Sequence, residues 1–99
     1  MPHEDAETLK AGLLATDLLA PFREHPGHLE VEVVGEGCFD LRVRRFDGLD
    51  VGPLNNRAFG TLREIDGAAL DGGYVTSGGP DGITVRYTYR LTAAPSPRP

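Results

Sequence analysis

The sequence of 99 residues is long enough for one small domain, and 39% of its residues are hydrophobic. Its net charge of −5 argues against nucleic acid and anionic membranes as partners, because both are bound through basic surfaces. The chain has one cysteine, no apolar run near the ~20 residues of a membrane span and no signal-peptide pattern at Met1–Lys10, so we expect a cytoplasmic protein without an internal disulfide.

The first predicted element is a helix over Asp5–Ala20. Acidic residues crowd its first turn, where the helix dipole favours negative charge, and Pro21 disfavours helical backbone at Ala20. Leucines cover more of its circumference than a solvent-facing helix needs: Leu9, Leu13, Leu14, Leu18 and Leu19. This excess indicates that a second chain covers part of the helix.

A β-hairpin is predicted next, because apolar and charged residues alternate in two runs that flank a glycine-rich turn. The runs are Leu29–Val34 and Phe39–Arg45. One face carries acids on the first strand opposite arginines on the second, which suits antiparallel neighbours. The other face is predicted to lie against the helices: Leu29, Val31, Val33, Leu41 and Val43.

The segment Asp47–Gly60 has no periodicity and is predicted to be a loop, of a length that is often functional. Thr61–Glu64 matches the capping box, which predicts a second helix that begins there and stops at Gly72–Gly73. A short strand at Tyr74–Thr76 follows.

The clearest strand in the sequence is Ile83–Leu91, which follows the turn residues Ser77–Gly82. Ala93–Pro99 holds three prolines and is predicted to be a disordered tail. Residues 1–92 are therefore predicted to form one α+β domain. Two helices would lie on one face of a four-stranded, mostly antiparallel sheet, in the order helix, strand, strand, helix, strand, strand.

Few residues point to chemistry by themselves. His25 and His28 are too few ligands for a metal site, and no base accompanies Cys38 to make it a nucleophile. Asp17 either lines a pocket or marks the solvent edge of the leucine surface. Ser77–Gly82 either cradles an anion with its amides or closes a hairpin. We expect no catalytic residue and no metal site.

Several segments between Gly27 and Leu91 follow the motif order of a known family. They are a central hairpin at Pro26–Val33 and Phe39–Arg44, an Asp-x-Gly-like step at Phe46–Gly48, a lid at Asp47–Phe59, a glycine-rich approach to a helix at Phe59–Glu64, and closing strands at Gly72–Val75 and Pro80–Arg86. In this order they resemble the later part of the histidine-kinase-like ATPase domain, the GHKL or Bergerat fold, in its sensor-kinase style.

The sequence departs from that family in ways that bear on nucleotide binding. Phe46 stands where the adenine-reading aspartate is expected, with Asp47 one place along, and Asp50 replaces a glycine of the same motif. The family's preceding strand and helix and its phospho-accepting hairpin are missing. If a nucleotide site survives, the resemblance implies these residues for it: Asp17 near the magnesium-binding asparagine, Asp47, Gly48, Gly60, and Gly82 with Thr84 at the last glycine box.

The first hypothesis is a non-catalytic regulatory or protein-interaction module that resembles a degenerate ATPase domain of this family. It would bind a protein partner or a second copy of itself through a sheet edge, without a cofactor. One alternative is an ATP- and magnesium-binding kinase or ATPase fragment. Another is an unrelated small α+β binding module whose turns only mimic the motifs.

Overall fold

The computed structural model describes residues 2–92, and the side chains from Asp5 onward. The predicted tail at 93–99 lies outside the described residues. The elements are α1 (Pro2–Leu14), the short 3-10 turns η1 (Ala20–Arg23) and η2 (Pro26–His28), β1 (Leu29–Gly35), β2 (Cys38–Arg44), α2 (Asn56–Thr61), β3 (Glu64–Ile65), β4 (Ala68–Gly79) and β5 (Gly82–Leu91).

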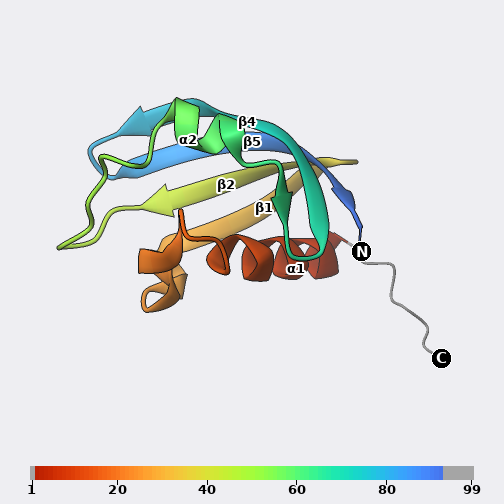
Figure 1. Cartoon of the computed structure of the whole chain (residues 1–99), viewed down its shortest axis with the longest axis horizontal. Helices are drawn as coiled ribbons and strands as arrows, with labels where there is room; N and C mark the ends of the chain where they lie inside the picture. Colours follow the sequence, from red (N-terminus) through yellow and green to blue (C-terminus); the bar gives the residue numbers. More distant parts are fainter. Residues whose placement is uncertain (1, 93–99) are drawn as a thin grey trace.

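The strands form one antiparallel sheet in the spatial order β1-β2-β5-β4-β3. The sheet curls, so that the turn between β3 and β4 reaches down to α1, which runs alongside β1 (Figure 1). The α+β class is as predicted. The sheet has five strands, however, and the prediction of four was wrong.

The predicted antiparallel hairpin is confirmed, with strand ends that differ from the prediction by one residue. β1 and β2 pair with Leu29 opposite Val43 and Val31 opposite Leu41. Leu29, Leu41 and Val43 are buried, while Val31 and Val33 are half-buried at the outer strand. The period-two pattern therefore identified the core face of this hairpin.

The first helix ends at Leu14, and the prediction that it continues to Ala20 was wrong. The Thr16 hydroxyl donates to the Leu13 carbonyl at 2.7 Å, which offers the backbone an alternative to the helical bond. Arg23 then donates to the carbonyls of Leu14 (2.6 Å) and Ala15 (2.8 Å). A cation at this helix end satisfies its free carbonyls and complements its dipole.

The second predicted helix, from Thr61 to Gly72–Gly73, was also wrong. A short helix, α2, begins earlier, where the Asn55 side chain accepts a hydrogen bond from the Ala58 amide at 2.9 Å. It occupies the end of the predicted loop Asp47–Gly60. The following residues form β3 and β4, because pairing with β5 satisfies the backbone of β4 along most of its length. Tertiary pairing here overrides a local helix signal.

Both helices contribute to one core. Leu9 and Leu13 of α1 and Phe59 of α2 are fully buried with residues of the central strands. The Tyr87 hydroxyl donates to the Phe59 carbonyl at 3.2 Å, and burial raises the pKa of Tyr87. Gly73 lies against the Tyr87 ring so closely that a β-carbon would overlap it. No helix in the described part is long and apolar enough to cross a membrane.

Candidate functional site

The residues implied by the family resemblance are spread over the fold. Gly82 and Thr84 lie on β5 and line one shallow hollow. Asp47 and Gly48 lie near the same end of the sheet, since the Arg45 amide donates to the Asp81 carbonyl at 2.9 Å. Gly82 has φ +153, and a β-carbon there would overlap the Val43 carbonyl. The strand pairing by itself therefore requires this glycine.

Gly60 and Asp17 lie elsewhere. Gly60 lies where α2 packs on β4, and a β-carbon there would make an ordinary contact with the Gly73 carbonyl at 3.4 Å. Gly73 lies against the Tyr87 ring, and Tyr87 is five residues along β5 from Gly82, roughly 17 Å at about 3.4 Å per residue. Asp17 is exposed in the turn after α1. The six residues thus separate into one group of four and two isolated positions.

The histidines of the sequence analysis pack around an aromatic side chain. His25 stacks on Phe46 with ring centroids 4.1 Å apart, and His28 meets the same ring edge-on at 5.5 Å. The His28 Nδ1 atom also lies 3.2 Å from the Arg45 carbonyl oxygen. Among the described residues, no three His, Cys, Asp or Glu side chains gather as metal ligands.

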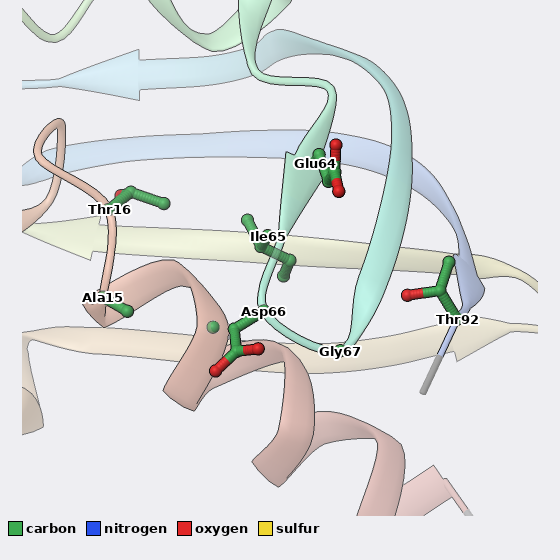
Figure 2. A pocket seen from close by; sticks show the side chains of 8 residues that line it. Ala15, Thr16, Glu64, Ile65, Asp66, Gly67 and Thr92 are labelled. Atoms are coloured by element: carbon green, nitrogen blue, oxygen red, sulfur yellow. The ribbon is translucent and has the colours of Figure 1, made fainter. Parts of the chain in front are cut away.

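A hollow of about 670 Å³ lies between the end of α1 and the turn from β3 to β4. Its polar groups include Thr16, Glu64, Asp66 and Thr92. Figure 2 shows that the Glu64 and Asp66 carboxylates lie on different sides of Ile65 and that Thr92 stands apart from both. Because these groups do not converge on one point, the hollow lacks the arrangement that fixes a small ligand.

A smaller, mostly apolar hollow of about 230 Å³ lies under the segment between β2 and α2. Val43, Leu49, Leu54 and Ile83 line it, with Arg45 at its margin. Its volume is below the ~300 Å³ typical of ligand pockets. We interpret it as the interior of this loop.

The face of the sheet opposite the core is a ladder of ion pairs. Arg42 lies 2.7 Å from Glu32, and Arg44 lies 3.9 Å from Glu30. On the central strands, Arg86 makes two hydrogen bonds to Asp40, at 2.7 and 3.0 Å. These bonds lower the pKa of Asp40, although its burial acts in the opposite direction. Acids and bases on this face largely satisfy one another.

The two edges of the sheet differ more sharply. On one edge, β3 pairs with the first residues of β4. Further along, α2 packs on β4, and the Asn56 side chain accepts a hydrogen bond from the Val75 amide at 2.8 Å. This edge is therefore covered along much of β4.

The other edge is the outer side of β1. The bonds from Tyr89 to Gly37 and from Arg45 to Asp81 show that odd-numbered residues of β2 bond to β5. The even-numbered residues therefore bond to β1, so that Glu30 and Glu32 direct their main chains toward β2. Val31 and Val33 direct theirs outward. Within residues 2–92, no hydrogen bond to these outward groups is seen.

A hollow of about 560 Å³ continues from this edge at the far end of β1. Val33, Val34 and Glu36 line it together with Asp5 and Tyr89. The Tyr89 hydroxyl donates to Asp5 at 2.8 Å, and burial together with this bond raises the pKa of Tyr89 to about 12. Asp5 is therefore bonded to Tyr89 of β5, whereas Glu36 is exposed beyond the end of β1.

Sequence reasoning predicted β1 as a strand but did not identify its outer side as a site. The alternation of apolar and charged residues shows which face of a strand is buried. It does not show which strands lie next to one another in the sheet. Comparison of the chain with protein-family models, with curated proteins and with solved structures gave no match. The geometry of the described residues is therefore the basis for the function that follows.

Proposed function

We propose that this chain is a non-catalytic protein-interaction module that binds an extended partner segment along the outer edge of β1. The observation that carries this proposal is the pair of outward main chains at Val31 and Val33, which have no hydrogen-bond partner within residues 2–92. Unpaired strand edges are templates for an added strand, and natural proteins usually shorten or cover them. β1 is seven residues long, whereas β3 on the other edge has two.

The residues along the outer edge of β1 suit the addition of a partner strand. Main-chain bonds supply affinity in this mode, and side chains on alternate positions supply specificity. The half-buried Val31 and Val33 and the 42% exposed Val34 offer apolar contacts beside the main chain. α1 packs along β1 and supports the strand (Figure 1).

A self-partner on the leucines of the first predicted helix, Asp5–Ala20, has less support than the sequence alone gave it. Leu19 is fully buried, and Leu14 and Leu18 pack against the same core. The chain's own core thus accounts for the leucine excess. A regulatory role in the cytoplasm and descent from a GHKL-type domain remain our proposals for the context of this module.

The test uses random peptides of about ten residues, displayed on phage and selected on the immobilised chain. Peptides that bind should lose at least about tenfold in affinity for Val31→Pro, because proline removes an outward amide and obstructs the edge. The exposed Val51 provides the control, and Val51→Ala should bind them normally. Selected peptides should also slow hydrogen exchange at Val31 and Val33.

Two outcomes would contradict the proposal. Peptides that bind Val31→Pro as well as the unaltered chain would place the contact elsewhere. Failure to select any peptide would indicate that α1 already screens the edge.

Nucleotide binding is the second candidate, supported by the position of Asp47, Gly48, Gly82 and Thr84 near one end of the sheet. We expect no binding of Mg-ATP tighter than about millimolar, because Phe46 offers no carboxylate to read adenine. Calorimetric titration measures this directly. Micromolar affinity would favour the kinase or ATPase alternative over the interaction module.

A further inference from the structure

We infer that the segment added to β1 is basic and comes from a different protein and not from a second copy of this chain. The inference rests on the proposed function and specifies its partner. It follows from the charges that stand along the unpaired edge and from what a neighbouring strand would place against them.

Glu30 and Glu32 alternate along β1 with Val31 and Val33, the residues whose main-chain groups face outward. Their side chains remain 47% and 54% exposed, although each has an arginine of β2 on its inner side. A carboxylate has two oxygens and several acceptor positions, so contact with one arginine leaves room for a second donor. Each glutamate is therefore available to a cation on its outer side.

An added strand would lie about 4.8 Å from β1, and its side chains would be direct neighbours of these glutamates. Lysine or arginine at the two facing positions would complete an alternating row of charges from β2 through β1 to the partner. Acidic residues there would be repelled. Glu36, exposed just beyond the end of β1, extends the same preference, as does the net charge of −5.

A second copy of β1 does not satisfy this preference. In an antiparallel pair centred on Glu32, the two copies of this glutamate would be opposite one another. A pair centred on Val31 would place Glu30 opposite Glu32. Like charges directly opposite destabilise a strand pair. The charge pattern therefore disfavours self-pairing and favours a partner of opposite sign.

The experiment measures binding of three fluorescein-labelled peptides of about seven residues by fluorescence polarisation. In the first, lysine alternates with valine; in the second, glutamate replaces each lysine; in the third, the lysines and valines of the first are grouped into two blocks. Only the first should bind appreciably. Its affinity should fall about tenfold in the double variant Glu30→Gln, Glu32→Gln, from two exposed charge pairs of about threefold each.

The matched control is Glu64→Gln, which removes an exposed carboxylate from β3 on the opposite edge and should leave affinity unchanged. Added salt at ~0.5 M should weaken the lysine peptide, because exposed charge pairs are screened. Light scattering of the free chain should give a monomer of 10.6 kDa.

The possible outcomes distinguish failure of this inference from failure of the proposed function, which is binding of a partner segment at the edge of β1. Equal binding of the lysine and glutamate peptides, with both lost in Val31→Pro, would overturn the basic preference and leave the edge site intact. Equal binding of the grouped peptide would indicate plain charge attraction and overturn the inference. A dimer dispersed by Val31→Pro would place a second copy on the edge and overturn it as well. Binding that is unaffected by Val31→Pro would overturn both proposals.

Discussion

The two edges of the sheet are built in opposite ways. The β4 edge is covered by a short strand, a short helix and the Asn56 side chain, which accepts a hydrogen bond from Val75. The β1 edge is one strand of seven residues, with a register shift between Val33 and Gly35, and its outward groups at Val31 and Val33 have no hydrogen-bond partner in the described chain. Both lie in the same small domain and share one core.

This difference separates the stabilisation of the fold from the capacity to bind. Residues that cover the β4 edge should contribute strongly to the free energy of unfolding, because they bury apolar surface or satisfy backbone groups. Residues along the outer side of β1 should contribute little, since their outward main-chain groups have no hydrogen-bond partner in the described chain. The predictions that follow test this contrast from the largest expected effect to the smallest.

The largest effect is expected for Phe59→Ala, which removes the anchor of α2 at the covered edge. Phe59 is fully buried and its carbonyl accepts the Tyr87 hydroxyl. Burial of this kind predicts a loss of about 4 kcal/mol in the free energy of unfolding, measured with urea. Val51→Ala, in an exposed part of the same segment, should cost less than about 0.5 kcal/mol. A loss below ~1 kcal/mol for Phe59→Ala would mean that α2 does not hold this edge.

Asp40 and Arg86 join β2 and β5 in the centre of the sheet, so their loss should weaken both edges alike. Asp40→Asn should cost about 2 kcal/mol at neutral pH, the loss expected for charged hydrogen bonds. The pKa of Asp40 is lowered from its ordinary 3.8, mainly by its hydrogen bond to Arg86. The stabilisation is therefore full above about pH 4 and is lost as the pH falls through the lower folded value.

Urea unfolding at neutral pH and near pH 2 checks this pH dependence. The difference between Asp40→Asn and the unaltered chain should shrink in acid. Asp81→Asn, an exposed carboxylate in the turn between β4 and β5, should show little effect at either pH. A difference for Asp40→Asn that persists in acid would mean that ionisation of Asp40 does not supply the stabilisation.

The parts of the fold that were predictable from the sequence are those with a strong local pattern. The hairpin of β1 and β2 and the strand β5 were read correctly, because each alternates with period two and has one buried face. The segment from Thr61 to Gly73 was misread as a helix, since the capping-box pattern is local and the pairing of β4 with β5 is not. The end of α1 was misplaced because Arg23, nine residues beyond Leu14, caps it.

The candidate site was less predictable than the fold. Glu30 and Glu32 were recognised as one charged face, but their place at an edge depends on the strand order, which no residue pattern encodes. Of the glycines that suggested a nucleotide site, Gly82 is required by packing, because a β-carbon there would overlap the Val43 carbonyl. Gly48 is favoured by its backbone, with φ +91, and a β-carbon at Gly60 would make only an ordinary contact with the Gly73 carbonyl. A glycine-rich sequence alone does not distinguish close packing from phosphate binding.

Asn56→Ala should convert part of the covered edge into an open one. The substitution leaves the Val75 amide without its side-chain acceptor, which predicts a loss of about 1 kcal/mol and about fivefold faster hydrogen exchange at Val75. Asn56→Asp keeps an acceptor oxygen at this position and should restore slow exchange. If exchange at Val75 is unchanged in Asn56→Ala, the side chain does not protect this edge.

The smallest loss of stability is expected for proline on the outward positions of β1, because the amide that proline removes there has no hydrogen-bond partner in the described chain. Val31→Pro should lower the free energy of unfolding by less than about 1 kcal/mol, as edge strands tolerate proline where the N–H faces solvent. The adjacent change Glu32→Pro provides the contrast, since the Glu32 amide faces β2 and its loss should cost about 3 kcal/mol or more. Urea unfolding of the two variants therefore tests which of two adjacent residues of β1 directs its amide toward β2. Equal losses would mean that the outer side of β1 is bonded or buried, and that the two edges of this sheet are less different than the register implies.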